Sequence, residues 1–177
     1  VSADLGWTVA LAEKGYLGGT CINTGCTPTK TMVHRAQVAH YARNAERWGV
    51  RAREVTVDLA KIVAQKRQVV ESFRAGHHKH IEERPNLHLH QGVARFVNAH
   101  QIKVGDTLLE SEKIFIDRGA GPLFPDVPGL DATGYLTNET VMELTDLPAH
   151  LIVLDVSRAG GKTTIVPGLE TPRGDES

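Results

Sequence analysis

The sequence predicts an α/β fold with a small antiparallel meander. Residues 8–13 form a short apolar segment with the length of a strand, and two long stretches with helical apolar spacing follow it. After these stretches the apolar period changes to two, which is typical of strands, in residues 87–116. A strand, two helices and several short strands in this order indicate one sheet with helices followed by a separate β-meander.

The first third of the chain is expected to contain a helix end, a buried strand and a long helix. Residues 1–6 resemble the tail of a helix, and the strand over 8–13 ends in the acidic residue Glu13. The long helix should open near Pro28, because proline is tolerated in a first turn, and should stop at Gly49. Its apolar residues are Met32, Val33, Ala36, Ala39, Ala42, Ala45 and Trp48.

A second helix is predicted from Asp58, a residue type that caps helix N-termini, to a point before Pro85. Its apolar residues are Leu59, Ile62, Val63, Val69, Val70 and Phe73.

The rest of the chain is predicted to be mainly short strands. Five are expected, at residues 87–90, 94–97, 101–104, 107–110 and 113–116, with a hairpin turn at 105–106. Three prolines in residues 122–128 indicate a linker, residues 138–145 a short helix, and residues 151–155 another apolar strand.

Composition indicates an ordinary protein of one or two small domains. The chain has 177 residues, of which 41% are hydrophobic and 23% charged, with a net charge of −1. This balance gives no long-range attraction for nucleic acid. No apolar run approaches the ~20 residues of a membrane span, and no targeting segment opens the sequence, so a cytoplasmic location is expected.

The chain has two cysteines, Cys21 and Cys26, within residues 18–30, which read GGTCINTGCTPTK. A disulfide needs Cα atoms roughly 4.4–6.8 Å apart. Residues five apart on a regular helix are separated by about 8.6 Å, so the pair can join only where the backbone departs from a helix. Gly25 provides that freedom, and a helix beginning near Pro28 would place the pair at its entrance, where the helix dipole and Lys30 favour a thiolate.

Three other roles for the cysteines remain open. A structural staple is disfavoured, because closing so short a loop stabilises a fold by only about 2 kcal/mol. Two thiols that never pair are common in reducing compartments. A zinc site is disfavoured, because the C-x4-C spacing is not followed by a second pair of ligands. The glycines, the preceding strand and the lysine favour redox chemistry.

Residues 18–30 closely resemble the redox-active segment of the flavin-dependent pyridine nucleotide-disulfide oxidoreductases. This family includes dihydrolipoamide dehydrogenase, glutathione reductase and mercuric reductase, and the TPTKT ending is most similar to the mercuric reductase branch. The resemblance covers roughly residues 1–154. It implies a Rossmann-like FAD-binding domain over 1–149 that lacks its first strand, glycine-rich turn and helix, and that carries a helical insert. Residues 150–177 would be a degenerate start of the NAD(P)-binding domain and a polar tail.

The resemblance also implies a mechanism. NAD(P)H reduces the flavin, the flavin reduces a Cys21–Cys26 disulfide, and the resulting thiols reduce a small-molecule disulfide or a metal-ion substrate. Cys21 would be the interchange sulfur, Cys26 the charge-transfer partner that faces the flavin, and Lys30 a cation near the flavin N5. Members of the family are homodimers.

The same resemblance assigns residues to FAD. Glu13 falls where an acid bonds the adenosine ribose, with Lys14 beside it. Gly19, Thr20 and Lys30 would lie along the flavin, and Gly92 and Ala94 would lie near the adenine. Gly119 would be the glycine of a second turn that contacts the flavin.

The sequence departs from the family in two turns. Residues 117–122, DRGAGP, keep only the glycine and the proline of the second flavin-contacting turn. Residues 155–160, DVSRAG, lack the first two glycines of the nicotinamide turn, where a β-carbon would block the pyrophosphate. The likeness ends at Asp155, so the resemblance implies a fragment without the family's nicotinamide and dimerisation domains. We therefore expect weak FAD binding and little NAD(P)H turnover, and a non-catalytic fragment is an alternative reading.

Two further alternatives involve other motifs. Residues 151–163 resemble a phosphate-binding loop, but Val156 stands where its first glycine belongs. A metal-binding module is a second alternative, although no carboxylate or cysteine spacing completes a site and no resident metal is predicted. Its candidate ligands are His77, His78, His80, His88 and His90.

Overall fold

The structure is a computed structural model that describes residues 2–122, 124, 126–154 and 164–167. It has a mixed α/β fold, as the sequence predicts. The chain divides into two compact units, one of Val1–Asn23 with Val70–Gly119 and the other of Thr24–Val69 with Ala120–Ser177. The predicted domain boundary at 149/150 stays a prediction.

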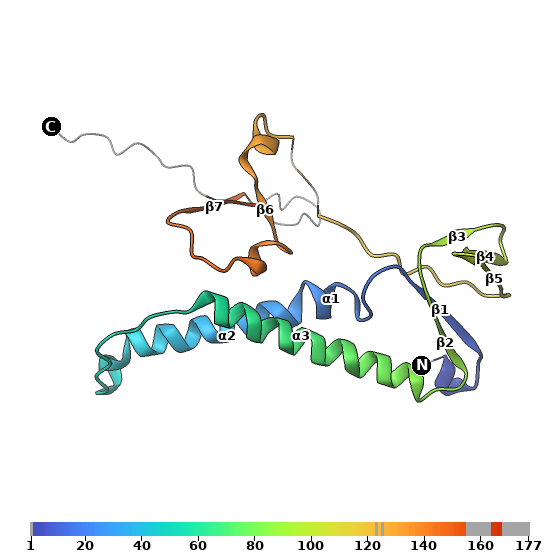
Figure 1. Cartoon of the computed structure of the whole chain (residues 1–177), viewed down its shortest axis with the longest axis horizontal. Helices are drawn as coiled ribbons and strands as arrows, with labels where there is room; N and C mark the ends of the chain where they lie inside the picture. The colour runs from blue at the N-terminus through green and yellow to red at the C-terminus, as the bar shows by residue number, and fades with distance from the viewer. Residues whose placement is uncertain (1, 123, 125, 155–163, 168–177) are drawn as a thin grey trace. The chain divides into compact units, whose positions relative to one another are not determined.

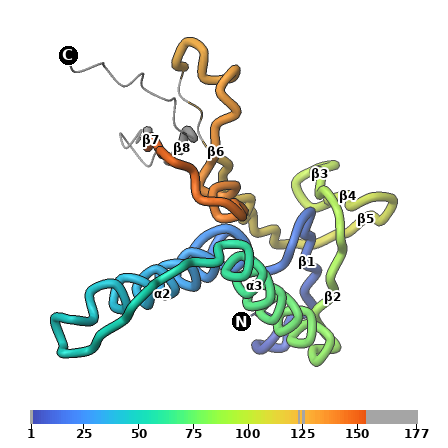
Figure 2. The backbone as a smooth tube through the Cα atoms, turned by 60° about the vertical axis from the view of Figure 1, so that its left-hand side comes forward, coloured from blue at the N-terminus to red at the C-terminus, as the bar shows by residue number. Residues whose placement is uncertain are grey.

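The first unit contains a parallel pair of strands. Strand β1 (Val9–Glu13) pairs with β2 (Leu87–Gln91) in a register that places Glu13 opposite Gln91 (Figures 1 and 2). The short helix η1 (Ala3–Leu5) precedes them and ends at Gly6, whose φ of 83° suits glycine. Both predicted strands are confirmed.

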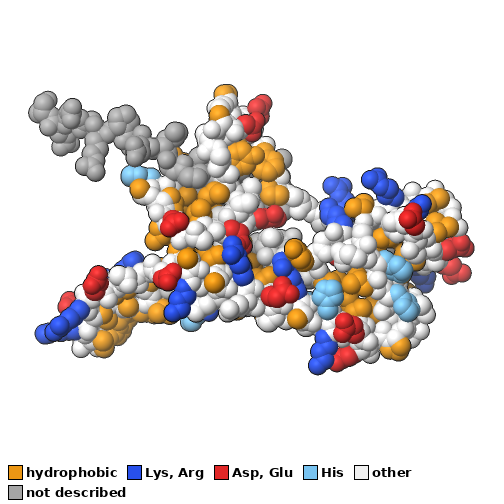
Figure 3. Space-filling model, viewed as in Figure 1, with side chains coloured by type: hydrophobic (Ala, Val, Ile, Leu, Met, Phe, Trp, Pro, Cys, Tyr) orange, Lys and Arg blue, Asp and Glu red, His pale blue; other side chains and the backbone are white. Residues whose placement is uncertain are grey.

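The expectation that β1 is buried is wrong. Leu11 on this strand is 38% exposed, and the sheet that contains β1 and β2 has two strands among the described residues. A two-stranded sheet leaves much of each strand uncovered, which explains the exposure. Exposed hydrophobic side chains also occur elsewhere, as the orange atoms on the face in Figure 3 show.

A three-stranded antiparallel meander completes the first unit. It consists of β3 (Ala94–Phe96), β4 (Gln101–Val104) and β5 (Thr107–Glu110), and Gly105 in the turn between the last two has a φ of 58°. The three strands and their hairpin turn were predicted from the period-two pattern. Val104 is buried, with 5% of its surface exposed.

The predicted strand at residues 113–116 does not form. The Ser111 hydroxyl accepts a hydrogen bond from the Lys113 N–H and donates one to the Lys113 carbonyl, so local contacts use the backbone groups that a strand ladder would need. Phe115 and Ile116 are 79% and 72% exposed. These apolar side chains therefore do not pack into a core of the described residues.

Three helices complete the redox-motif region and the insert. These are α1 (Gly19–Asn23), α2 (Cys26–Arg43) with the extension η2 (Ala45–Trp48), and α3 (Leu59–Glu82). Helix α2 begins two residues before Pro28, which is buried in its first turn, and the extension ends at Gly49 with a φ of 73°. No helix in the described part of the chain is long and apolar enough to cross a membrane.

The predicted apolar stripes are only partly buried. Val63 on α3 has no exposed surface, whereas Val33 is 49%, Trp48 62% and Phe73 50% exposed. Asp58 caps α3 as expected, because its Oδ1 accepts the Lys61 N–H at 2.8 Å.

The second unit also contains the C-terminal elements. These are η3 (Leu130–Thr133), β6 (Leu136–Thr137), η4 (Val141–Glu143), β7 (Leu151–Leu154) and β8 (Thr164–Pro167). The strands form an antiparallel sheet in the order β6-β8-β7. The helix expected over 138–145 is reduced to the single turn η4. Before it, the Thr140 hydroxyl accepts the Thr137 N–H and the Thr137 hydroxyl accepts the Thr140 N–H. Residues 155–163, with the altered nicotinamide turn and most of the phosphate-loop letters, and the tail at 168–177 lie outside the described residues.

Candidate functional site

The two cysteines lie on successive helices separated by a break. Cys21 is in the middle of α1, and Cys26 is the first residue of α2. Gly25 between them has φ −123° and ψ −113°, which are not helical angles, so the backbone is interrupted where a disulfide requires it. Both side chains are exposed thiols in the structure. The prediction that the pair stands at a helix entrance is confirmed.

The first turn of α2 begins at Cys26. Its backbone N–H groups and dipole carry partial positive charge, and the Thr29 N–H already bonds the Gly25 carbonyl at 3.1 Å. Lys30 is exposed one turn further along the helix. Its proposed place near a flavin stays a prediction.

Two glycines shape the approach to Cys21. Gly18 has a φ of 96° and Gly19 a φ of 58°, both in the left-handed region. A β-carbon on Gly18 would lie 2.7 Å from Ile22 Cδ1, so any other residue would clash with α1. Thr20, which follows them, is exposed. Close packing therefore requires glycine at residue 18, whereas at residue 19 the positive φ alone favours it.

The carboxyl ends of β1 and β2 bring together two predicted FAD contacts. The Gly92 N–H donates to the Glu13 carbonyl at 2.8 Å, and the Gly15 N–H donates to Glu13 Oε1 at 2.8 Å. Gln91 Nε2 also donates to the Gly15 carbonyl at 2.8 Å, which fixes the turn after β1. Ligands of open α/β sheets bind at the carboxyl ends of parallel strands, and the FAD contact expected of Glu13 stays a prediction.

Gly92 is constrained on one side. Its φ is 147°, and a β-carbon there would lie 3.1 Å from Val104 Cγ1. Ala94 follows it at the start of β3 and pairs with Val104. Lys14 is exposed in the turn after β1, and Gly119, with a φ of 71°, is the last residue of the first unit.

The sequence reasoning missed Asn23 and Arg74. Asn23 Nδ2 donates to three backbone carbonyls around the double glycine, and Asn23 Oδ1 accepts from Arg74 Nε at 2.6 Å. Asn23 could have been found as a residue between the two cysteines. Arg74 had no signal, because it is one of many helix-surface cations in the sequence.

A salt bridge in the second unit anchors the segment that contacts α2. The Lys66 ammonium, 2% exposed, bonds the Glu143 carboxylate, which also accepts Arg67 Nε at 2.8 Å. Burial raises the Glu143 pKa, but the hydrogen bonds and charges of the two cations outweigh it and leave this pKa below its usual value. The neighbouring Met142 accepts a hydrogen bond from the Thr29 hydroxyl of α2 at 3.4 Å.

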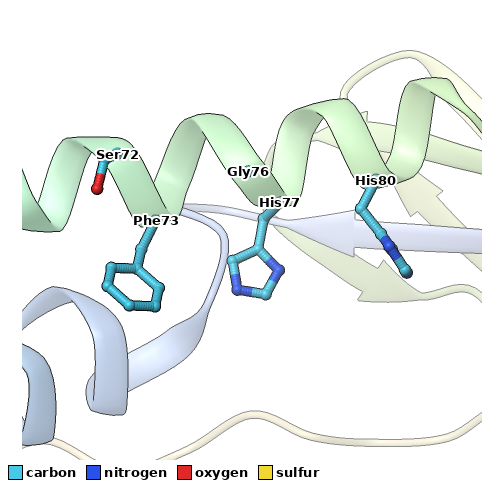
Figure 4. Close-up of a pocket in the computed structure, with 5 residues that line it drawn as sticks. All are labelled: Ser72, Phe73, Gly76, His77 and His80. Carbon is cyan, nitrogen blue, oxygen red and sulfur yellow. The ribbon is translucent and has the colours of Figure 1, made fainter.

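The histidines do not form a metal site in the described residues. A shallow cavity of about 370 Å³ on α3 is lined by Ser72, Phe73, Gly76, His77 and His80. Figure 4 shows Phe73, His77 and His80 projecting from the same side of the helix. No group of three His, Cys, Asp or Glu side chains suited to a metal ion occurs in the part of the chain that was described.

Comparison with known proteins gives a consistent result. The family model described as pyridine nucleotide-disulphide oxidoreductase matches residues 2–154. The mercuric reductase of Lysinibacillus sphaericus is 32% identical over 151 residues, which are 85% of this chain and 28% of that protein. The probable pyridine nucleotide-disulfide oxidoreductase RclA of Escherichia coli is 35% identical over 159 residues, 86% of this chain and 32% of RclA.

Solved structures agree with the sequence relatives. The HOCl-induced flavoprotein disulfide reductase RclA from Escherichia coli superposes with a TM-score of 0.70 at 33% identity, covering 84% of this chain and 31% of that one. Its Cu(II) complex gives a TM-score of 0.69 at 34% identity, with coverages of 84% and 31%. The chain thus spans about a third or less of the length of these relatives. These matches agree with the helix break between Cys21 and Cys26 and with the contact of Glu13 and Gly92 at the strand ends. The chain belongs to the pyridine nucleotide-disulphide oxidoreductase family.

Proposed function

We propose that this chain supplies the FAD-binding site and the redox-active cysteines of a reductase for small disulfides or metal ions. The observation that carries the proposal is the break at residues 24–25. It separates the helices α1 and α2, on which Cys21 and Cys26 are exposed. A family whose members are flavoprotein disulfide reductases and mercuric reductases gives the reaction class. NAD(P)H is the proposed electron source, bound outside residues 1–149.

The residues at the strand ends fit the adenosine part of FAD. A ribose hydroxyl needs an acceptor, and Glu13 has a carboxylate whose Oε1 is held by the Gly15 N–H, which orients the group. Gly92 places backbone without a side chain beside it. We assign Glu13, Lys14, Gly92 and Ala94 to the adenosine end.

Glycine-rich backbone beside the cysteines suits the flavin end. Gly19 has open space where a β-carbon would stand, so a planar ring system can approach its backbone closely. We assign Gly19, Thr20, Lys30 and Gly119 to this end. FAD, when bound, would supply the electron pair that reduces the disulfide.

The cysteines would then carry the exchange. The S–S bond takes up two electrons and two protons and becomes two thiols. The Cys21 thiolate attacks a substrate disulfide and forms a mixed disulfide, which releases the first substrate thiol. The Cys26 thiolate, at the N-terminus of α2, attacks the Cys21 sulfur, reforms the S–S bond and releases the second thiol.

Thiol counting tests the proposal. The chain is oxidised with oxidised glutathione, mixed with FAD that is reduced anaerobically by light and EDTA, and alkylated for mass spectrometry. We expect two new thiols per chain, at a rate that saturates with FAD concentration. Glu13→Gln should require about tenfold more FAD for half the maximal rate, because a charge-assisted hydrogen bond is lost.

Glu110→Gln is the matched control, since Glu110 also ends a strand and is exposed, and it should leave the FAD dependence unchanged. A rate that rises linearly with FAD, without saturation, would show reduction in free solution and contradict a flavin site on this chain.

A further inference from the structure

We infer that Asn23 and Arg74 are positioning residues that set the redox equilibrium of the Cys21–Cys26 pair. The inference rests on the proposed function, because it assumes that the two cysteines form a disulfide. It adds two residues, one of them 48 positions beyond Cys26 in the sequence, to the redox motif.

Asn23 fastens the entry loop to the helix that carries Cys21. Its Nδ2 donates to the Gly19 carbonyl at 2.8 Å, to the Leu17 carbonyl at 3.0 Å and to the Tyr16 carbonyl at 3.3 Å. One amide group therefore serves three carbonyls on the residues that lead into α1. Leu17 is 6% exposed, so burial of its side chain also holds this loop in place.

Arg74 holds the other side of the Asn23 amide. Its Nε donates to Asn23 Oδ1 at 2.6 Å, and its guanidinium lies 3.6 Å from the centre of the Tyr16 ring. The Arg74 side chain is 21% exposed, so these contacts are partly shielded from water. A guanidinium that donates and stacks at once is fixed more firmly than a simple ion pair. We call Asn23, Arg74 and the Tyr16 ring the loop clamp.

Helix α1 depends on such a clamp. It has five residues, far fewer than an isolated helix needs, and it follows two glycines with positive φ. Asn23 ends the helix and bonds the carbonyl of Gly19 at its start, so Cys21 lies between the two ends of a closed hydrogen-bonded span. The position of the Cys21 sulfur therefore follows the clamp.

The position of Cys21 affects the disulfide because bond formation tolerates little misplacement. The Cα atoms must approach within roughly 4.4–6.8 Å, and only four residues separate the cysteines along the chain. A loose α1 spreads Cys21 over more positions and lowers its effective concentration at Cys26. Loss of the clamp should therefore favour the two thiols over the disulfide.

Redox titration tests the inference. The full chain is equilibrated in buffers of reduced and oxidised glutathione, where one oxidised glutathione takes two electrons and two protons from the cysteine pair and becomes two reduced molecules. The disulfide fraction is read by alkylation and mass spectrometry. We expect Asn23→Ala and Arg74→Gln each to lower the equilibrium constant for disulfide formation about tenfold, a rise of about 30 mV in reduction potential.

The chain contains a matched control pair in the same unit. Asn86 Nδ2 donates to the carbonyls of Ala3 and Trp7, and Arg84 Nε donates to Asp4 at 3.0 Å with 27% of its side chain exposed. Asn86→Ala and Arg84→Gln remove the same kinds of contact away from the cysteines. They should lower the unfolding midpoint and leave the glutathione equilibrium unchanged, which separates positioning from stability.

The outcomes distinguish the inference from the proposed function. The inference alone is overturned if the wild type forms the disulfide and neither clamp variant changes its equilibrium constant by more than the control variants do. A wild-type chain that forms no Cys21–Cys26 disulfide at any glutathione ratio overturns the proposed function and the inference with it. Circular dichroism verifies that each variant is folded, and Arg74→Gln provides the test if Asn23→Ala unfolds.

Discussion

At the scale of single residues, the most costly group in the described structure is the buried ammonium of Lys66. A charge with 2% exposure is stable only when it is paired. Glu143 supplies the pair, and Arg67 shares the same carboxylate. The carboxylate side chain is 47% exposed, so water screens part of the interaction.

Glu143→Gln should therefore destabilise the chain by about 1–2 kcal/mol, because it leaves the buried ammonium with a neutral partner. Urea unfolding followed by circular dichroism measures this loss. Glu83→Gln is the control, since Glu83 is 60% exposed and 3.7 Å from Lys79, and it should cost less than about 0.5 kcal/mol. Equal losses in the two variants would contradict the assignment of Glu143 as the essential partner.

The same pair predicts a pH dependence. Because the Glu143 pKa is lowered in the folded state, the native carboxyl binds a proton less readily than the unfolded one. Its contribution to stability is complete well above the unfolded pKa of about 4.5 and is lost as pH falls through the folded pKa. The difference in unfolding free energy between wild type and Glu143→Gln should shrink below pH 4.5, and a constant difference would argue against this coupling.

At the scale of elements, the helix boundaries illustrate what local sequence controls. Asp58 caps α3 through a hydrogen bond to the Lys61 N–H, and the residue type alone predicted it. The end of η2 at Gly49 was predicted for the same kind of reason, since a positive φ favours glycine.

Asp58→Ala should lower the unfolding free energy by about 1 kcal/mol, because the Lys61 N–H loses its acceptor. Asp58→Asn keeps a capping oxygen and should retain most of the stability. Thermal unfolding of the two variants measures the difference. An alanine variant as stable as the asparagine variant would mean that the cap does not contribute to the free energy of unfolding.

Elements that depend on distant partners were predicted less well. The period-two pattern of residues 113–116 has the right letters for a strand, but the Lys113 backbone groups bond Ser111 instead. The stripe on α2 predicted burial for Val33, which is 49% exposed. Apolar spacing states which face could be buried, whereas burial itself needs another element to cover that face.

At the scale of the whole molecule, ligand binding couples to stability. Any ligand that binds the folded chain and not the unfolded one stabilises it by mass action, about 2.7 kcal/mol at 100 times its dissociation constant. FAD should therefore raise the melting temperature in a concentration-dependent way. Riboflavin, which lacks the adenosine that we assign to Glu13 and Gly92, should have a much smaller effect.

Differential scanning fluorimetry with an external dye measures both shifts, and Glu13→Gln should reduce the FAD shift alone. Equal shifts from FAD and riboflavin would contradict an adenosine contact at the carboxyl ends of β1 and β2.

The sequence by itself determined the redox motif and its local geometry. Residues 18–30 predicted the interruption at Gly25 and a helix entrance near Pro28, because both depend on backbone preferences within a few residues. Their resemblance to a known family supplied the expected reaction class. The parallel pairing of β1 with β2, which brings Glu13 beside Gly92, was not predicted from the sequence.

Only the tertiary structure decided which residues far apart in the sequence meet in space. Arg74 meets Asn23 across 51 positions, and Lys66 meets Glu143 across 77. Both cations have the letters of ordinary surface residues on a helix. Their partners are set by the path of the folded chain. Hydrogen bonds and ion pairs act over a few ångströms, and the spacing of two residues in the sequence does not give the distance between them in the fold.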